Sequence, residues 1–251
     1  MPAPSSESAD LEASALVRLS TPSVLHNLQI LHADAQLIVV NKPAGLLSVP
    51  GRGPDKQDCV WRRVQVDFAD AQVVHRLDQA TSGLLVLARG PQAQRVLSKT
   101  FADRQVTKRY LAWVQDHPVE ATSVSETHPA PPGWQAIDLP IAADWPNRPR
   151  QIISPEGRPS LTYWRVLERQ QEPDRALLEL EPHTGRSHQL RVHLQAIGHP
   201  ILGDALYQSA GGPASPCLQL HAWRLSLPHP QDGRVLAFEA PTPPSWGRIQ
   251  A

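Results

Sequence analysis

Runs of alternating apolar and polar residues, and shorter runs that are wholly apolar, predict a chain built mainly from β-strands. The run at residues 83–88 is apolar on both faces, which is typical of a strand buried on both sides. Residues 162–167 and 176–180 alternate across a polar turn, so we expect them to form an antiparallel pair. Further strands are predicted at residues 30–31, 37–40, 109–114, 218–227 and 235–238.

Helical periodicity is limited to three segments, at residues 58–68, 91–101 and 187–197. In the second of these, we expect Val96 and Leu97 to face the core. Sparse helices between many strands predict an α+β fold, in which helices flank a large mixed, mostly antiparallel sheet. The 26 prolines disfavour long helices, and therefore a coiled coil or a helical bundle.

The segment at residues 187–197 has a polar side that carries positive charge. Ser187 is the expected N-cap, and Arg186 lies at the helix mouth, where free backbone amides favour anions. No acidic residue occurs from position 184 to 203, so this side either binds an anionic partner or is a solvated helix face. The apolar stripe consists of Leu190, Leu194 and Ile197, and the opposite stripe of His188, Arg191 and Gln195.

A second charged motif directly precedes the apolar strand at residues 83–88. The sequence His75-Arg-Leu-Asp is followed by a turn through Thr81-Ser-Gly, so Asp78 lies at the edge of a strand. From that position a carboxylate can face a cleft. The alternative is that Asp78 only caps the turn.

The remaining segments indicate one domain with a tail and two loops. Residues 1–25 are rich in Ala, Ser, Pro and acidic residues, which predicts a flexible tail before a single domain at 26–251. Residues 117–135 and 208–216 carry turn signals and predict surface loops. Because the chain opens on an acidic segment and its apolar runs are short, we expect a cytoplasmic protein without membrane contact.

Charge and cysteine content narrow the classes of function. The chain has 24 basic and 24 acidic side chains, so it lacks the basic excess of a protein that coats nucleic acid indiscriminately. Any contact with nucleic acid must therefore be local. Two cysteines are too few for a disulfide framework or a Cys-rich zinc site.

Three motifs occur in an order and spacing that resemble the RluA-type pseudouridine synthases, over about residues 28–240. The motifs are His75-Arg-Leu-Asp with Thr81-Ser-Gly, Lys108-Arg-Tyr-Leu-Ala, and Thr184-Gly-Arg-Ser-His-Gln-Leu-Arg-Val-His with Gly198-His-Pro-Ile-Leu-Gly-Asp. Residues 41–52 and 144–151 resemble the dual-specificity branch of that family, which modifies 23S ribosomal RNA and transfer RNA. The resemblance implies the pseudouridine synthase fold, with an active-site cleft across the sheet.

The resemblance also implies roles for individual residues. Asp78 matches the family's catalytic aspartate, Tyr110 the tyrosine that stacks on the target uracil, and Arg191 the basic residue that pairs with the aspartate. Arg76 matches the arginine that enters the RNA where the target nucleotide leaves it. The further residues that we expect to contact RNA are His75, Thr81, Arg186, His188 and Arg150.

The implied reaction fits these residue types. It breaks the N1–C1′ bond of uridine, rotates the uracil and joins C5 to C1′. Nothing is oxidised and no group is imported, so we expect no cofactor and no metal. Asp78 either stabilises or traps positive charge at C1′, as carboxylates do in glycosidases, or abstracts the C2′ proton. Flipping the base costs a few kcal/mol, which stacking of the Arg76 guanidinium can partly offset.

The leading hypothesis is a monomeric synthase acting on uridines in stem-loops of 23S ribosomal RNA and transfer RNA, without an obligatory protein partner. A rival hypothesis is a synthase specific for ribosomal RNA. Such relatives often carry an N-terminal S4 RNA-binding domain, which we do not expect here because only about 27 residues precede the core. Two hypotheses from different classes are a non-catalytic RNA-binding module and a glycosidase. A glycosidase would need a second carboxylate near Asp78.

Overall fold

A large sheet dominates the computed structural model, which describes residues 23–118, 125, 128–208 and 215–247. Within these residues, eleven strands form one sheet, and two more form a separate hairpin, β8 (Ile141–Ala143) and β9 (Gln151–Ile153). The strands of the large sheet are β1 (Ser23–Leu25), β2 (Leu28–Ala33), β3 (Leu37–Lys42), β4 (Ala71–Val73), β5 (Ser82–Arg89), β6 (Thr107–Gln115), β7 (Gln135–Asp138), β10 (Leu161–Gln171), β11 (Asp174–Pro182), β12 (Leu220–Pro228) and β13 (Val235–Glu239).

The sheet has the strand order β1-β2-β3-β5-β12-β6-β11-β10-β7, with β4 added to β5 and β13 added to β12. The helices are α1 (Val60–Gln65), α2 (Gly90–Ala102) and α3 (Gln189–Ala196), with short 3-10 helices η2 (Pro54–Lys56) and η3 (Pro244–Trp246). All pairs of the large sheet are antiparallel among the described residues, except β5 with β12. The predicted α+β fold with a mixed, mostly antiparallel sheet is therefore confirmed.

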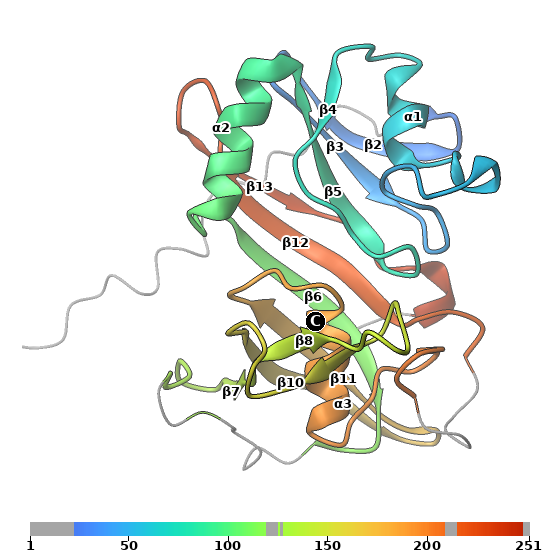
Figure 1. The fold of residues 1–251 in the computed structure, drawn as a ribbon, viewed down its shortest axis with the longest axis vertical. Helices are drawn as coiled ribbons and strands as arrows, with labels where there is room; N and C mark the ends of the chain where they lie inside the picture. The colour runs from blue at the N-terminus through green and yellow to red at the C-terminus, as the bar shows by residue number, and fades with distance from the viewer. Residues whose placement is uncertain (1–22, 119–124, 126–127, 209–214, 248–251) are drawn as a thin grey trace, which may run out of the picture.

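Two hydrophobic cores lie in the two halves of the molecule. In Figure 1, α1 and α2 lie beside β2 to β5 in the upper half, and α3 lies with β6, β10 and β11 in the lower half. The first core contains buried side chains of β3, β5 and α2, and the second contains those of β6, β11 and α3. Tyr110 packs against both cores, so it marks the junction between the halves.

Glycine is required where the two halves join. β5 and β12 run parallel, with Gly83 opposite Ala222. A Cβ atom on Gly83 would lie 2.2 Å from the carbonyl oxygen of Ala222, and the φ angle of Gly83 is +105°. On its other side, Ala222 pairs with Tyr110 of β6. Tyr110 on β6 is therefore separated from β5, the strand that follows the Asp78 loop, by β12 alone.

The predicted helix α2 is confirmed, but its predicted buried face is partly wrong. Leu97 is fully buried, whereas Val96 is 39% exposed. The buried positions are Ala93, Leu97 and Thr100, which follow helical spacing along a single stripe. Val96 lies about 100° away from Leu97 around the helix axis, on the solvent side.

Helix α3 is confirmed, but its expected cap is wrong, and one residue of its polar stripe is buried. The helix begins at Gln189, and His188 occupies the N-cap with a left-handed φ of 54° and no capping side chain. The Gln189 side chain turns back towards the preceding segment, where its Oε1 accepts a hydrogen bond from the Arg186 amide. Arg191 of the predicted polar stripe is only 5% exposed, because its guanidinium pairs with the buried Asp204 and lies against the Tyr207 ring.

Other expectations fall partly outside the described residues. Residues 128–134 of the predicted loop at 117–135 contain no helix or strand, while 119–124 and 126–127 are not described. The predicted tail at 1–25 and loop at 208–216 also lie largely outside the described residues. The last three residues of the tail, Ser23–Leu25, form β1 and pair with β2, so the sheet begins before the expected boundary at residue 26. No helix in the described ranges is long and apolar enough to cross a membrane.

Replacing Gly83 tests the junction between the halves. Gly83→Ala places a Cβ against the Ala222 carbonyl in a backbone conformation that L-residues avoid, and we expect it to lower the free energy of unfolding by about 3 kcal/mol. Gly233→Ala is the matched control, because Gly233 has a φ of +72° but open space around it. Its expected loss, from the backbone alone, is about 1 kcal/mol. Equal losses in urea denaturation would contradict the proposed clash.

Candidate active site

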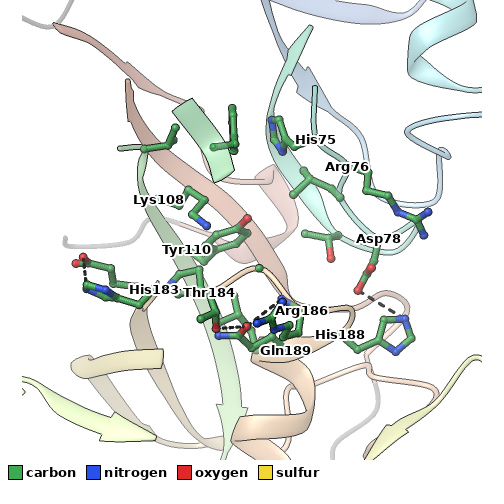
Figure 2. Close-up of a pocket in the computed structure, with 18 of the residues that line it drawn as sticks. His75, Arg76, Asp78, Lys108, Tyr110, His183, Thr184, Arg186, His188 and Gln189 are labelled. Carbon is green, nitrogen blue, oxygen red and sulfur yellow. Dashed lines mark hydrogen bonds and ion pairs between the residues drawn. The ribbon is translucent and has the colours of Figure 1, made fainter. Parts of the chain in front are cut away.

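A cleft of about 630 Å³ opens beside the junction of the two cores. It lies between the loop that joins β4 to β5 and the segment that joins β11 to α3, with β6 across it (Figure 2). Of the nine residues expected to act on or bind the substrate, eight line this cleft; Arg150 does not. The lining has five Arg or Lys residues against two carboxylates, although the whole chain is neutral. The positive charge is therefore local, as expected.

Asp78 is held in place through the backbone on both of its sides. On one side, the Ser48 hydroxyl donates to the Leu77 carbonyl at 2.8 Å and accepts from the Leu77 amide at 3.1 Å. On the other, the buried Lys42 ammonium donates to three backbone carbonyls, including that of Gln79 at 3.0 Å. Burial lowers the pKa of Lys42 to about 7, while the Asp78 charge acts in the opposite direction.

The Asp78 side chain faces the cleft and does not cap the turn. Its Oδ2 atom lies 3.4 Å from Nη1 of Arg191 and 3.8 Å from Nε2 of His188 (Figure 2). The turn is instead closed by the backbone, through a hydrogen bond from the Thr81 amide to the Asp78 carbonyl. Within the described residues, Oδ1 of Asp78 has no hydrogen-bond partner, so it is the oxygen available to a substrate.

Arg191 is held mainly by a second carboxylate that the sequence analysis did not identify. Its Nε and Nη2 atoms donate to the two carboxylate oxygens of Asp204, each at 2.7 Å. Both side chains are buried, and this bidentate geometry fixes the plane of the guanidinium. Only Nη1 remains directed at Asp78. The expected absence of a neutralising acid is wrong, because Asp204 lies one residue beyond the 184–203 window.

Tyr110 reaches the cleft from β6, where it pairs with Ala222 of β12 and Leu180 of β11. Burial and the nearby Asp78 carboxylate raise the pKa of the Tyr110 hydroxyl above its ordinary value. The hydroxyl therefore keeps its proton at neutral pH. Its aromatic ring is rigidly placed by two neighbouring strands, and it lines the cleft opposite the Asp78 loop (Figure 2).

The His75 side chain binds and packs against other residues of the protein. Its Nε2 accepts a hydrogen bond from the Val86 amide at 3.0 Å, and its ring stacks on Phe101 at 4.5 Å between centroids. Burial is the main cause that lowers the pKa of His75 to about 3. The ring is therefore neutral, and the ring nitrogen that faces the protein is an acceptor.

The other residues predicted to contact RNA differ in how exposed their side chains are. Arg76 is exposed at the cleft and has no hydrogen bond or ion pair with any described residue. Thr81 is buried in the wall, and Arg186 donates from Nε to the Pro159 carbonyl at 3.3 Å. Arg150 lies outside the cleft, with its guanidinium 5.6 Å from the centre of the Tyr207 ring.

Sequence and structure comparisons agree on the family. Residues 36–196 match the model of the family described as RNA pseudouridylate synthase. The chain belongs to the RNA pseudouridylate synthase family. The matched region contains the Asp78 loop, Tyr110 and Arg191, three parts of the cleft lining. The fold is thus the pseudouridine synthase fold that the sequence motifs implied.

Curated proteins and solved structures give the same assignment. The dual-specificity RNA pseudouridine synthase RluA of Escherichia coli K12 is 45% identical over 216 residues, covering 85% of this chain and 93% of that protein. The protein of that name from Vibrio vulnificus is 46% identical over 208 residues, covering 81% and 78%. The structure of human RNA Pseudouridylate Synthase Domain Containing 1 has a TM-score of 0.69 at 29% identity, covering 90% and 89%.

Three residues of this synthase site escaped the sequence analysis. Lys42 lies in the motif Asn41-Lys-Pro-Ala-Gly, which reads as a turn because of its proline and glycine. Asp204 ends the motif that begins at Gly198, and only its place in that motif could have drawn attention to it. Tyr207 reaches the site through its hydroxyl, 2.8 Å from Nδ1 of His188, and no local pattern indicates this contact.

His75→Gln tests the neutral state of His75. Because the pKa of His75 is lower in the folded protein than its ordinary 6.5, the unfolded chain takes up the proton first as the pH falls below that value. This group therefore costs up to about 1.4 kcal/mol of stability per pH unit as the pH falls from about 6.5 towards 3. Gln keeps an acceptor for the Val86 amide without titrating, so unfolding free energy should depend less steeply on pH in that range. An unchanged slope would contradict a buried neutral His75.

Asp204→Asn tests the partner of Arg191. It leaves a buried guanidinium without its bidentate carboxylate, and we expect the free energy of unfolding to fall by about 3–5 kcal/mol. Glu239→Gln is the control, because Glu239 pairs with Arg224 at 2.8 Å on the surface. Its expected effect is below about 1 kcal/mol. Equal effects in chemical denaturation would show that Asp204 does not hold Arg191.

Proposed function

We propose that this enzyme converts uridines to pseudouridine in stem-loops of both 23S ribosomal RNA and the transfer RNA anticodon arm. The observation that carries the proposal is the placement of Asp78 between Arg191 and the Tyr110 side of a locally basic cleft. The relatives of 44–46% identity bear the name dual-specificity RNA pseudouridine synthase, which supports two classes of RNA as substrates. Residues 144–151, in the β8–β9 hairpin, support the same branch of the family.

The catalytic roles that we propose follow the geometry of the three central residues. Asp78 presents Oδ1 to the C1′ or C2′ side of the target nucleotide, while Arg191 neutralises Oδ2 from 3.4 Å. Tyr110 offers an aromatic face to the uracil, and its retained proton makes its hydroxyl a hydrogen-bond donor. The isomerisation needs neither an oxidant nor an imported group. No cofactor or metal is therefore part of the proposal.

RNA binding is assigned to the residues that border the cleft. Arg76 is an exposed, unpaired guanidinium beside the Asp78 loop, which suits insertion where the flipped nucleotide leaves the stack. Arg186, His188, Thr81 and His75 border the same space. Arg150 lies further out in the β8–β9 connection, where Arg148 stacks on the exposed Trp145 at 3.3 Å. A guanidinium stacked on an exposed aromatic ring suits contact with the RNA outside the target base.

The proposal includes the cellular setting that the motifs and the family support. One domain, whose sheet begins with β1 at Ser23, acts as a monomer in the cytoplasm, without an obligatory protein partner. RNA is its macromolecular partner. The positive lining of the cleft within a neutral chain supports binding that depends on RNA shape.

Tritium release from uracil C5 tests this function, because the new C5–C1′ bond ejects that hydrogen. An anticodon stem-loop and a 23S ribosomal RNA fragment are offered separately to the wild-type enzyme and to Asp78→Asn. We expect release from both RNAs and a loss of at least about 100-fold in the variant, because the amide carries no negative charge.

Asp55→Asn is the control for this test, because Asp55 is an exposed acid on η2 outside the cleft. It should retain wild-type activity. Release from only one RNA would overturn the dual specificity, and near-normal release by Asp78→Asn would overturn the role of Asp78. Binding of both RNAs without any release would favour an RNA-binding module.

A further inference from the structure

Behind Asp78, a chain of polar contacts runs from the β8–β9 hairpin to the carboxylate. The Gln151 amide donates to the Tyr207 hydroxyl at 2.7 Å. The same hydroxyl lies 2.8 Å from Nδ1 of His188. On the other side of the imidazole, Nε2 of His188 lies 3.8 Å from Oδ2 of Asp78, as Figure 2 shows. Three elements distant in sequence thus meet at one side chain of the cleft.

The direction of hydrogen-bond donation along these contacts is fixed by the Gln151 amide. A backbone amide is a permanent donor, so the Tyr207 oxygen must accept from Gln151. The hydroxyl proton is then free to point at His188, and Nδ1 of His188 accepts it. A neutral imidazole that accepts at Nδ1 carries its proton at Nε2. The N–H group therefore faces the Asp78 carboxylate.

Packing holds the rings of Tyr207 and His188 in the positions that these contacts require. Tyr207 is 2% exposed and packs with Ile141 and Val192, while the guanidinium of Arg191 lies 5.0 Å from its ring centre. His188 stands perpendicular to the Tyr207 ring, with centroids 5.7 Å apart. Its backbone is held in the left-handed region, at a φ of 54°, which is uncommon outside glycine. Such strain is typical of sites where a side chain must take one orientation.

We propose that Tyr207 and His188 are positioning residues for the reaction: Tyr207 fixes the Nε2–H tautomer of His188, and His188 orients Oδ2 of Asp78 so that Oδ1 meets the substrate. This inference rests on the proposed function, because it concerns the same carboxylate. His188 works together with Arg191, which approaches the same oxygen from 3.4 Å. Both donors leave Oδ1 unoccupied.

The charges around His188 are consistent with a neutral ring. Burial is the main cause that lowers its pKa, and the positive charges of Arg191 and Arg76 act in the same direction. The carboxylates of Asp78 and Asp204 act in the opposite direction. Protonation of His188 would turn Nδ1 into a donor facing Tyr207, and the tyrosine hydroxyl would lose its acceptor. The contact with Tyr207 therefore opposes protonation as well.

The tautomer can be read directly in the free protein. In wild-type protein labelled with ¹⁵N-histidine, we expect the His188 signals, assigned by their loss in His188→Gln, to show a bare Nδ1 and a protonated Nε2 at neutral pH. In Tyr207→Phe, which keeps the ring but lacks the hydroxyl, we expect mixed tautomers and protonation at a higher pH. A protonated Nδ1 in the wild-type protein would overturn the proposal. This measurement needs no RNA turnover, so its failure is distinguishable from failure of the proposed function.

A double-mutant cycle tests the consequence for catalysis. We expect Tyr207→Phe to lower kcat about tenfold, the order of one hydrogen bond, with RNA affinity unchanged. His188→Gln places an amide N–H group where Nε2–H lies, so it should lower kcat less than His188→Leu, which has no donor. In the His188→Gln background, adding Tyr207→Phe should change kcat less than about twofold, because no tautomer remains to be fixed.

A structural role for Tyr207 would give a different pattern. A purely structural hydroxyl would cost the same fraction of kcat in both backgrounds, and that result would overturn the proposal. Unchanged kcat in Tyr207→Phe would also overturn it. Thermal unfolding and RNA binding are measured for each variant, so that a loss of folded protein is not taken for a loss of kcat.

Discussion

The close backbone contact between β5 and β12 is the constraint on which the rest of the site depends. At Gly83 the two strands approach so closely that no side chain fits, and the parallel pair joins two halves with separate cores. Ala222 then pairs with Tyr110 on its far side. The Asp78 loop of one half and the aromatic ring of the other are therefore brought to one cleft by backbone geometry.

Buried charged residues hold the Arg191 guanidinium and the Asp78 loop of this cleft in place. Asp204 takes two of the three guanidinium nitrogens of Arg191, and the remaining one faces Asp78. Lys42 acts in another way, because its ammonium binds carbonyls and fixes the loop rather than the carboxylate. Lys42, Arg191 and Asp204 thus bind different partners. Among the described residues, Oδ1 of Asp78 has no hydrogen-bond partner. A chain with a formal net charge of zero thus has a cleft with a basic lining.

Periodicity predicted the long strands and α2 well, because burial on one or both faces leaves a repeating pattern in the sequence. It missed β1, β4, β7, β8 and β9, which have only three or four residues each and are too short to show a period. The burial of Arg191 was not predicted either, because its partner Asp204 lies outside the helix. The motifs identified Asp78, Tyr110 and Arg191, but Asp204 and Tyr207 reach the site through tertiary contacts that no local pattern records.

The junction between the halves also determines when the active site can form during synthesis and folding. Ser82 and His221, which meet across β5 and β12, are 139 residues apart in the chain. Contacts over such a separation form late in folding, since a long loop must close first. The core that contains β3, β5 and α2 also includes Leu225 and Leu227 of β12 and Leu236 of β13, so this half too is complete only after the last strands have been made. The cleft is complete only when almost the whole chain has been made, so an unfinished chain holds Asp78 but has no assembled active site.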